Sequence, residues 1–69
     1  MTITSIALTI YCVEKQPLFG NPPSPISGIW ETIDVFASEA SAQKLCEQIR
    51  QAYGAQPVVV RVVKRTVSP

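Results

Sequence analysis

The sequence has no histidine, only two cysteines and few charged residues, which make up 16% of its 69 positions. Histidine is the commonest general base and a frequent metal ligand, and a nucleophilic cysteine needs a neighbouring base or cation. Two cysteines alone are too few ligands for a zinc site. We therefore expect no metal, no cofactor and no enzymatic activity.

Long apolar runs are also missing. No uninterrupted run reaches the roughly 18 residues that a membrane helix needs. The apolar N-terminal segment has no basic residue before it and no small-residue cleavage site after it. We expect no membrane association, a cytoplasmic location and two free, buried thiols, since disulfide scaffolds of this size usually carry four or more cysteines.

The net charge of +1 is small for a protein that binds nucleic acid. The charges are nevertheless segregated along the chain. All five acidic residues lie between Glu14 and Glu47, whereas Arg61, Lys64 and Arg65 lie close together near the C-terminus. A local basic patch therefore stays open as an alternative.

The patterns that are present predict one domain over residues 1–69: a strand over 3–14, a proline-rich loop over 15–28, a strand over 29–36, a helix over 39–53 and a strand over 58–67. The first strand alternates, with Ile6, Leu8, Ile10 and Cys12 on one side and Ser5, Ala7, Thr9 and Tyr11 on the other. The density of proline in the loop predicts no regular pairing there.

Ser38 is a suitable N-cap and Gly54 a suitable C-terminal stop for the helix. Its apolar stripe consists of Ala42, Leu45, Cys46, Ile49 and Tyr53. Cys12 and Cys46 are expected to point into the same core. Phe36 alternates onto the side opposite Val35, but at the end of its strand it can also turn back under the helix.

These elements predict an α+β fold of order β-β-α-β, with a three-stranded, mostly antiparallel sheet and one helix on one face. The first strand is the longest and most apolar, which favours the central position. The alternative order makes the second and third strands adjacent and parallel.

One helix can cover only one side of the sheet, so the other side is expected to be open. An isolated carboxylate is costly to bury, so the Asp34 side of its strand is assigned to this open side. The expected open residues, which are also the candidate partner-binding residues, are Tyr11, Trp30, Thr32, Asp34, Val59, Arg61, Val63 and Arg65, together with Thr9. Tryptophan, tyrosine and arginine are enriched in binding hot spots, although an ordinary sheet can also expose a few large side chains.

The proline-rich loop exposes Leu18 and Phe19 as a second candidate binding element. A stiff, extended segment of this kind suits docking on another protein. The alternative is that these side chains anchor a long connection under the edge of the sheet.

The stretch IDVFASEASAQKLCEQIRQAYGAQPVVVRVV, from Ile33 to Val63, resembles one half of a sporulation-related repeat domain. That family has a strand ending in an aromatic residue, a serine-capped helix and a valine-rich strand. The resemblance covers under half of the chain and supports the fold. The family has two such halves and binds cell-wall glycan on its sheet, whereas residues before Ile33 do not repeat the unit.

Together these features predict a non-enzymatic protein-interaction module, either a homodimer or an accessory or inhibitory subunit that binds another protein. Short domains without catalytic groups are often encoded by phages or mobile elements, and such an origin is the background expectation. The alternative function is binding of single-stranded nucleic acid by Tyr11, Trp30, Arg61 and Arg65.

Overall fold

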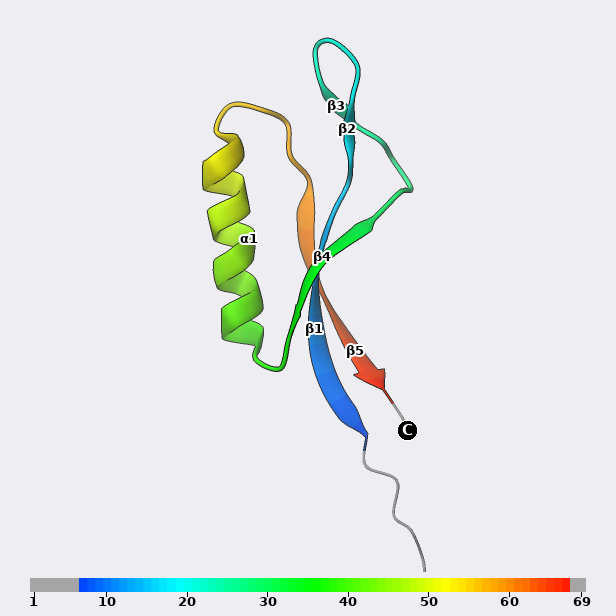
Figure 1. Ribbon diagram of the computed structural model, residues 1–69, viewed down its shortest axis with the longest axis vertical. Coiled ribbons are helices and arrows are strands. Elements are labelled where there is room, and N and C mark those ends of the chain that lie inside the picture. The colour runs from blue at the N-terminus through cyan, green and yellow to red at the C-terminus, as the bar shows by residue number, and fades with distance from the viewer. Residues whose placement is uncertain (1–6, 68–69) are drawn as a thin grey trace, which may run out of the picture.

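The computed structural model describes residues 7–67, and within them it confirms the expected α+β class (Figure 1). Strand β1 (Leu8–Lys15) is the centre of a three-stranded sheet of order β4-β1-β5, with β4 (Glu31–Phe36) and β5 (Val60–Val67) on its flanks. Both flanking strands run antiparallel to β1. The alternative with adjacent parallel second and third strands is therefore excluded.

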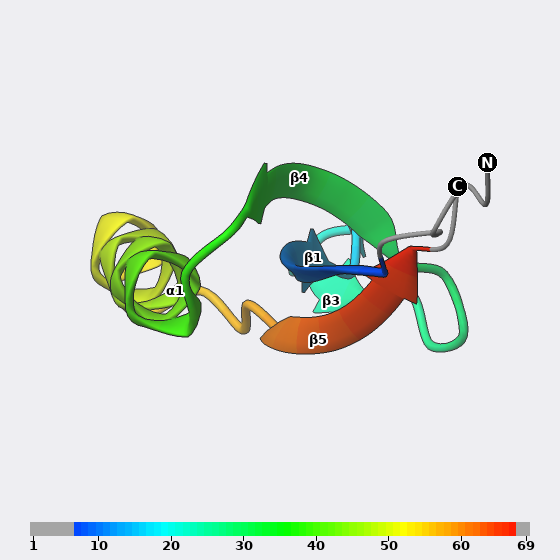
Figure 2. The same cartoon turned by 90° about the horizontal axis from the view of Figure 1, so that it is seen from below.

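The helix α1 (Glu39–Tyr53) has the expected bounds. The Ser38 hydroxyl oxygen accepts a hydrogen bond from the Ser41 N–H at 3.4 Å, and Gly54 ends the helix with a φ of 59°. The Gly54 N–H donates the last helical hydrogen bond to the Arg50 carbonyl at 3.2 Å, and the positive φ of Gly54 is one that favours glycine. Viewed along the strands, α1 lies to one side of the sheet, next to β1 and both flanking strands (Figure 2).

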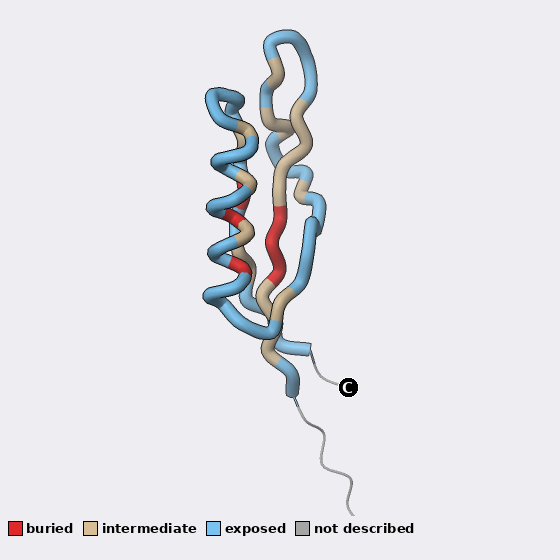
Figure 3. Tube along the Cα trace, turned by 60° about the vertical axis from the view of Figure 1, so that its left-hand side comes forward, coloured by how far each residue is buried: buried red, intermediate tan, exposed pale blue. Residues whose placement is uncertain are grey.

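The core lies between α1 and the middle of the sheet (Figure 3). Its buried members are Val13, Ala42, Cys46 and Val60, and the partly buried side chains packed around them are Tyr11, Phe36, Leu45, Ile49 and Val62. The helical stripe predicted from the sequence is therefore confirmed at four of its five positions by the core cluster. The odd-numbered positions Tyr11 and Val13 of β1 face the helix.

This orientation of β1 is opposite to the expected one. Cys12 was expected to point into the same core as Cys46, but it alternates with Val13 and lies on the side of the sheet away from α1. The apolar residues at both parities of β1 made the two orientations equally plausible for a central strand. Cys12 and Cys46 are nevertheless both buried and free.

A β-bulge changes the alternation of β4. Val13 is opposite Asp34 and Glu14 is opposite Thr32, so Ile33 is the extra residue between them. The bulge and the core position of Phe36 place Asp34 in the row that faces α1, whereas Val35, opposite Cys12, is in the row on the other side. The expected sides of Asp34 and Val35 were therefore wrong.

The prediction that the proline-rich segment has no regular pairing was wrong, because the segment contains a short paired region. Strands β2 (Leu18–Phe19) and β3 (Ser24–Pro25) pair antiparallel, with Leu18 opposite Pro25. The Ile26 N–H donates to the Pro17 carbonyl at 2.9 Å. Pairing is possible because β2 contains no proline and β3 contains only Pro25, so the N–H groups of other residues serve as donors.

The second and third expected strands each begin two residues later than predicted, at Glu31 and Val60, and the first strand ends one residue later, at Lys15. The expected strand segment 3–6 lies outside the described residues.

Candidate interaction surface

The side of the sheet that α1 does not cover is called the open face below. Its members follow from the register and the alternation of the strands: Leu8, Ile10, Cys12 and Glu14 from β1, Arg61, Val63, Arg65 and Val67 from β5, and Thr32 and Val35 from β4.

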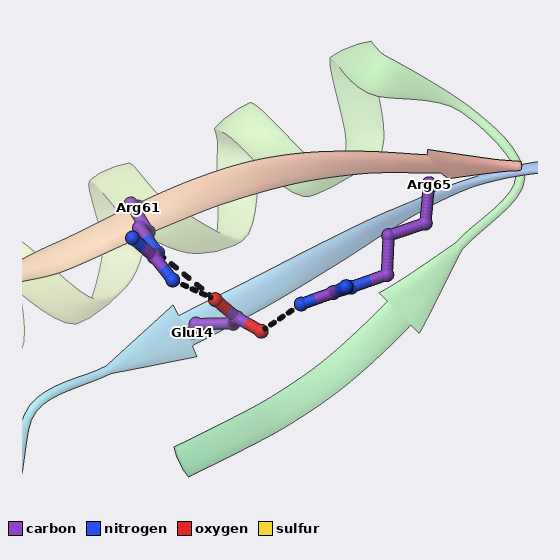
Figure 4. A network of polar contacts seen from close by, with 3 residues as sticks. All are labelled: Glu14, Arg61 and Arg65. Atoms are coloured by element: carbon purple, nitrogen blue, oxygen red, sulfur yellow. Dashed lines mark hydrogen bonds and ion pairs between the residues drawn. The ribbon is translucent and has the colours of Figure 1, made fainter. Parts of the chain in front are cut away.

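A buried carboxylate held by two arginines lies at one end of the open face (Figure 4). Glu14 Oε1 accepts from Arg61 Nε at 2.9 Å and lies 2.8 Å from Arg61 Nη2, while Glu14 Oε2 accepts from Arg65 Nη2 at 3.1 Å. The side chain of Glu14 is 6% exposed, whereas those of Arg61 and Arg65 are 44% and 53% exposed. The acid is therefore desolvated and the two bases remain in contact with water.

The register of β1 and β5 produces this arrangement. Glu14 is directly opposite Arg61, and Arg65 lies four residues further along the same strand, on the same side of the sheet. Two arginines at this spacing can reach one carboxylate from both directions. We call Glu14, Arg61 and Arg65 the carboxylate clamp.

The clamp sets the charge state of Glu14. Burial raises the pKa of this carboxyl, but the hydrogen bonds and charges of Arg61 and Arg65 lower it, and the net result is a pKa below the ordinary 4.5. In turn, the Glu14 carboxylate raises the pKa of Arg65, with a smaller contribution from Cys12. Both shifts favour the charged forms of Glu14 and Arg65.

Trp30, just before β4, stacks on the clamp. The guanidinium carbon of Arg61 lies 3.8 Å from the centroid of the Trp30 ring, within the range of a cation–π contact. Trp30 is half-buried by this arrangement. An aromatic ring and two arginines thus surround a buried acid on a face that no other element of residues 7–67 covers.

Apolar residues of the open face lie both between the rows of Arg61 and Arg65 and beyond Arg65. Cys12 is buried between Val35 and Val63, its neighbours on the two flanking strands. Leu8, Val35 and Val67 are exposed. The open face therefore combines a polar, aromatic end with an apolar end.

The structure places only some of the expected partner-binding residues on the open face. Arg61, Val63, Arg65 and Thr32 lie on the open face, and Trp30 contacts it through Arg61. Tyr11 does not, because it packs against the core beneath α1, and the same orientation of β1 excludes Thr9.

Asp34 and Val59, which were also expected on the open face, are both exposed. Asp34 lies in the helix-side row, but it stays exposed at the edge strand, and its Oδ1 accepts from the Val35 N–H at 2.7 Å. Its charge therefore remains hydrated on either side of the sheet. Val59 precedes β5 with an exposed side chain, and its carbonyl accepts from the Gln16 N–H at 3.0 Å.

The hairpin of β2 and β3 extends past the end of the sheet (Figure 1). Phe19 is 75% exposed, whereas Leu18 is half-buried. Of these two candidates, only Phe19 presents most of its side chain to solvent.

Glu14 is the central residue that sequence reasoning missed. A signal was present: Glu14 has the same parity as Ile10 and Cys12, and Arg61 and Arg65 share one side of a strand. The register of β1 with β5 was needed to bring these residues together, and it does not follow from either segment alone.

No family model, curated protein or solved structure matches the chain. The likeness of residues 33–63 to a sporulation-related repeat thus concerns the order of elements only. Over residues 7–67 no helix is long and apolar enough to span a membrane, and no group of three or more potential metal ligands comes together. No pocket opens on this part of the chain.

Proposed function

We propose that this protein is a non-enzymatic interaction module that binds a protein surface, either a second copy or another protein, through its open face. The observation that carries the proposal is the combination of the stacked Trp30 and Arg61 with the exposed apolar residues Leu8, Val35 and Val67 on the same face. Tryptophan and arginine are the residue types most enriched in hot spots, and they contribute most when apolar neighbours exclude water around them.

The clamp supports this proposal because it fixes the shape of the surface before binding. Arg61 is held by Glu14 at one end and by the Trp30 ring on its flat side. A partner therefore meets a side chain with little rotamer freedom left to lose, which lowers the entropic cost of association.

The contacts favour this function over binding of single-stranded nucleic acid. One ring face of Trp30 is already occupied by Arg61, and Tyr11 is packed in the core. One of the two positive charges of the open face is also balanced by Glu14. The open face therefore has fewer free aromatic rings for base stacking, and fewer unbalanced positive charges for the phosphate backbone, than binders of single-stranded nucleic acid use.

The test is a double substitution, Leu8→Asn with Val35→Asn, which removes apolar surface without changing charge. Size exclusion with light scattering measures self-association, and affinity capture from the source cells, followed by mass spectrometry, measures other partners. The matched control is Ile29→Asn, which changes an exposed apolar residue outside the sheet. The proposal predicts that the double variant loses a partner that the control retains.

Equal partners for the wild type, the double variant and the control would contradict the proposal. Phe19→Asn in the same experiment tests the hairpin, and loss of partners in that variant alone would assign binding to the loop. Circular dichroism of each variant verifies that the fold is intact.

A further inference from the structure

The two edges of the sheet carry opposite charges. Strand β4 has two acidic residues, Glu31 and Asp34, and no basic one, whereas β5 has three basic residues, Arg61, Lys64 and Arg65, and no acidic one. All five are exposed as residues. Since the strand order is β4-β1-β5, these are the two outer strands, and over residues 7–67 no further strand pairs with either outer edge.

From this charge separation we propose that copies of this chain associate edge to edge, with β5 of one copy adding to β4 of the next. An open strand edge offers a row of N–H and C=O groups that another strand can satisfy. On β4 the Val35 N–H already donates to Asp34 Oδ1 at 2.7 Å, so an added strand pairs with the other backbone groups of this edge. This inference uses the edges of the sheet and does not depend on the open face as a binding surface.

Charge decides which edges can meet. Pairing β5 with β5 places arginines and lysine against the same set, and pairing β4 with β4 places acids against acids, which is unfavourable for directly opposed strands. Only the unlike pair is attractive. Basic residues on an edge strand usually prevent pairing, but here they select against one pairing and in favour of the other.

The topology shows how the unlike edges fit. Both β4 and β5 run antiparallel to β1, so they are parallel to one another. Because each strand of a twisted sheet is rotated by about 20–25° from its neighbour, a copy that is displaced sideways and rotated by about 60–75° brings β5 against β4 as a parallel pair, with both helices on the same face of the continued sheet. Three strands repeat about every 14 Å, and a helix is about 10–12 Å across, so neighbouring helices have room.

One ion pair is specific to this arrangement. Asp34 is opposite Val13 and Lys64 is opposite Tyr11, so both lie in rows on the helix side. Within a copy the two are offset by two residues. A shift of two residues between copies, about 6.6 Å, preserves the side-chain parity and brings Asp34 of one copy next to Lys64 of its neighbour.

This contact is heterologous, because the two copies contribute different surfaces. Such contacts propagate into open chains or close into rings, unlike a two-fold dimer. The association is also salt-dependent, since the Debye length falls from about 14 Å to about 4 Å between roughly 0.05 and 0.5 M salt.

The test is sedimentation velocity of the whole chain up to about 1 mM protein at both salt concentrations. The wild type is expected to form a series of oligomers at low salt that dissociates at high salt. Asp34→Lys and Lys64→Glu each oppose like charges at every contact, and each is expected to weaken association about three- to tenfold. Lys44→Glu, on the exposed side of α1, is the control and is expected to leave association unchanged.

Mixing the two edge variants provides the decisive arm. In the mixture, the lysine introduced by Asp34→Lys meets the glutamate introduced by Lys64→Glu, and the unchanged Asp34 of one variant meets the unchanged Lys64 of the other. The mixture is therefore expected to associate more strongly than either variant alone. A wild type that stays monomeric at low salt overturns the inference, and so does a mixture that associates no better than its components. A third outcome also overturns the inference: a dimer that is disrupted by Leu8→Asn with Val35→Asn but stays intact in both edge variants. That outcome would support the open face as the binding surface.

Discussion

The carboxylate clamp predicts an asymmetry between removing its acid and removing one of its bases. In Arg61→Met, Glu14 Oε1 loses the donors at 2.9 and 2.8 Å and stays in a site where its side chain is 6% exposed. Losing hydrogen bonds to a buried charge costs about 1.5–3 kcal/mol, and losing the contact with Trp30 adds about 0.5–1 kcal/mol. We expect Arg61→Met to lower the free energy of unfolding by about 2–4 kcal/mol.

Removing the acid has a smaller effect. In Glu14→Met an apolar side chain of similar length fills the site, and both arginines are already exposed enough to be hydrated. Replacing a buried charge by a well-packed apolar group is often neutral. We therefore expect Glu14→Met to cost less than about 1 kcal/mol, against a total stability of about 3–10 kcal/mol for a domain of this size.

Urea denaturation followed by circular dichroism measures both effects. With a slope near 1 kcal/mol per molar urea, the midpoint is expected to fall by about 2 M or more in Arg61→Met and by less than about 1 M in Glu14→Met. The double variant should be more stable than Arg61→Met, because no unpaired carboxylate remains. A larger loss in Glu14→Met than in Arg61→Met would refute the reasoning.

Three further predictions concern acid, the core and the thiols. Folding lowers the pKa of Glu14, so its stabilising contribution is present above about pH 4.5 and is lost as the pH falls through the folded-state pKa. The urea midpoint of the wild type should therefore fall on acidification below about pH 4.5. The midpoint of Glu14→Met should fall less steeply. Equal acid dependence in both proteins would be inconsistent with the clamp. Val13→Ala removes two methyl groups from a fully buried site and should lower the free energy of unfolding by about 1.5–3 kcal/mol, measured by heat or urea. The control Val67→Ala, at an exposed position, should lower it by less than about 0.5 kcal/mol. Similar losses in the two variants would contradict the assigned core. Both thiols are buried, and burial raises the pKa of Cys46 more than the charge of Arg50 lowers it. Labelling by a thiol-disulfide reagent should therefore be slow in the native state and fast in urea. Rapid labelling of Cys46 in the native state would argue against its buried position.

The sequence predicted the elements and their order more reliably than the sides of the strands. The capping residues Ser38 and Gly54 predicted both ends of the helix without error. The long apolar run of the first strand correctly indicated that β1 is central in the sheet. The orientation of β1 could not be predicted in the same way, because a central strand between a helix and an apolar open face has apolar residues at both parities. Tyr11 was therefore assigned to the wrong side.

For β4, the argument from the cost of burying a carboxylate failed for a physical reason. Asp34 lies on an edge strand, where a side chain on either side can reach water. The bulge at Ile33 then changed the alternation without any glycine to indicate it. The same limit applies to Glu14, whose role depends on a register between segments 47 residues or more apart.

The strand order has a consequence for how the chain folds. Neither ladder of the main sheet is a tight hairpin: β4 returns to β1 only after the proline-rich segment, and β5 pairs Val67 with Leu8 across almost the whole described chain. Such distant pairings require the closure of long loops before they gain any stabilising contact, which slows folding. A chain cut before Val60 would keep α1 and two strands of the main sheet but lack Val60 and Val62 beneath the helix. The native state should therefore be reached in a single cooperative step that includes β5.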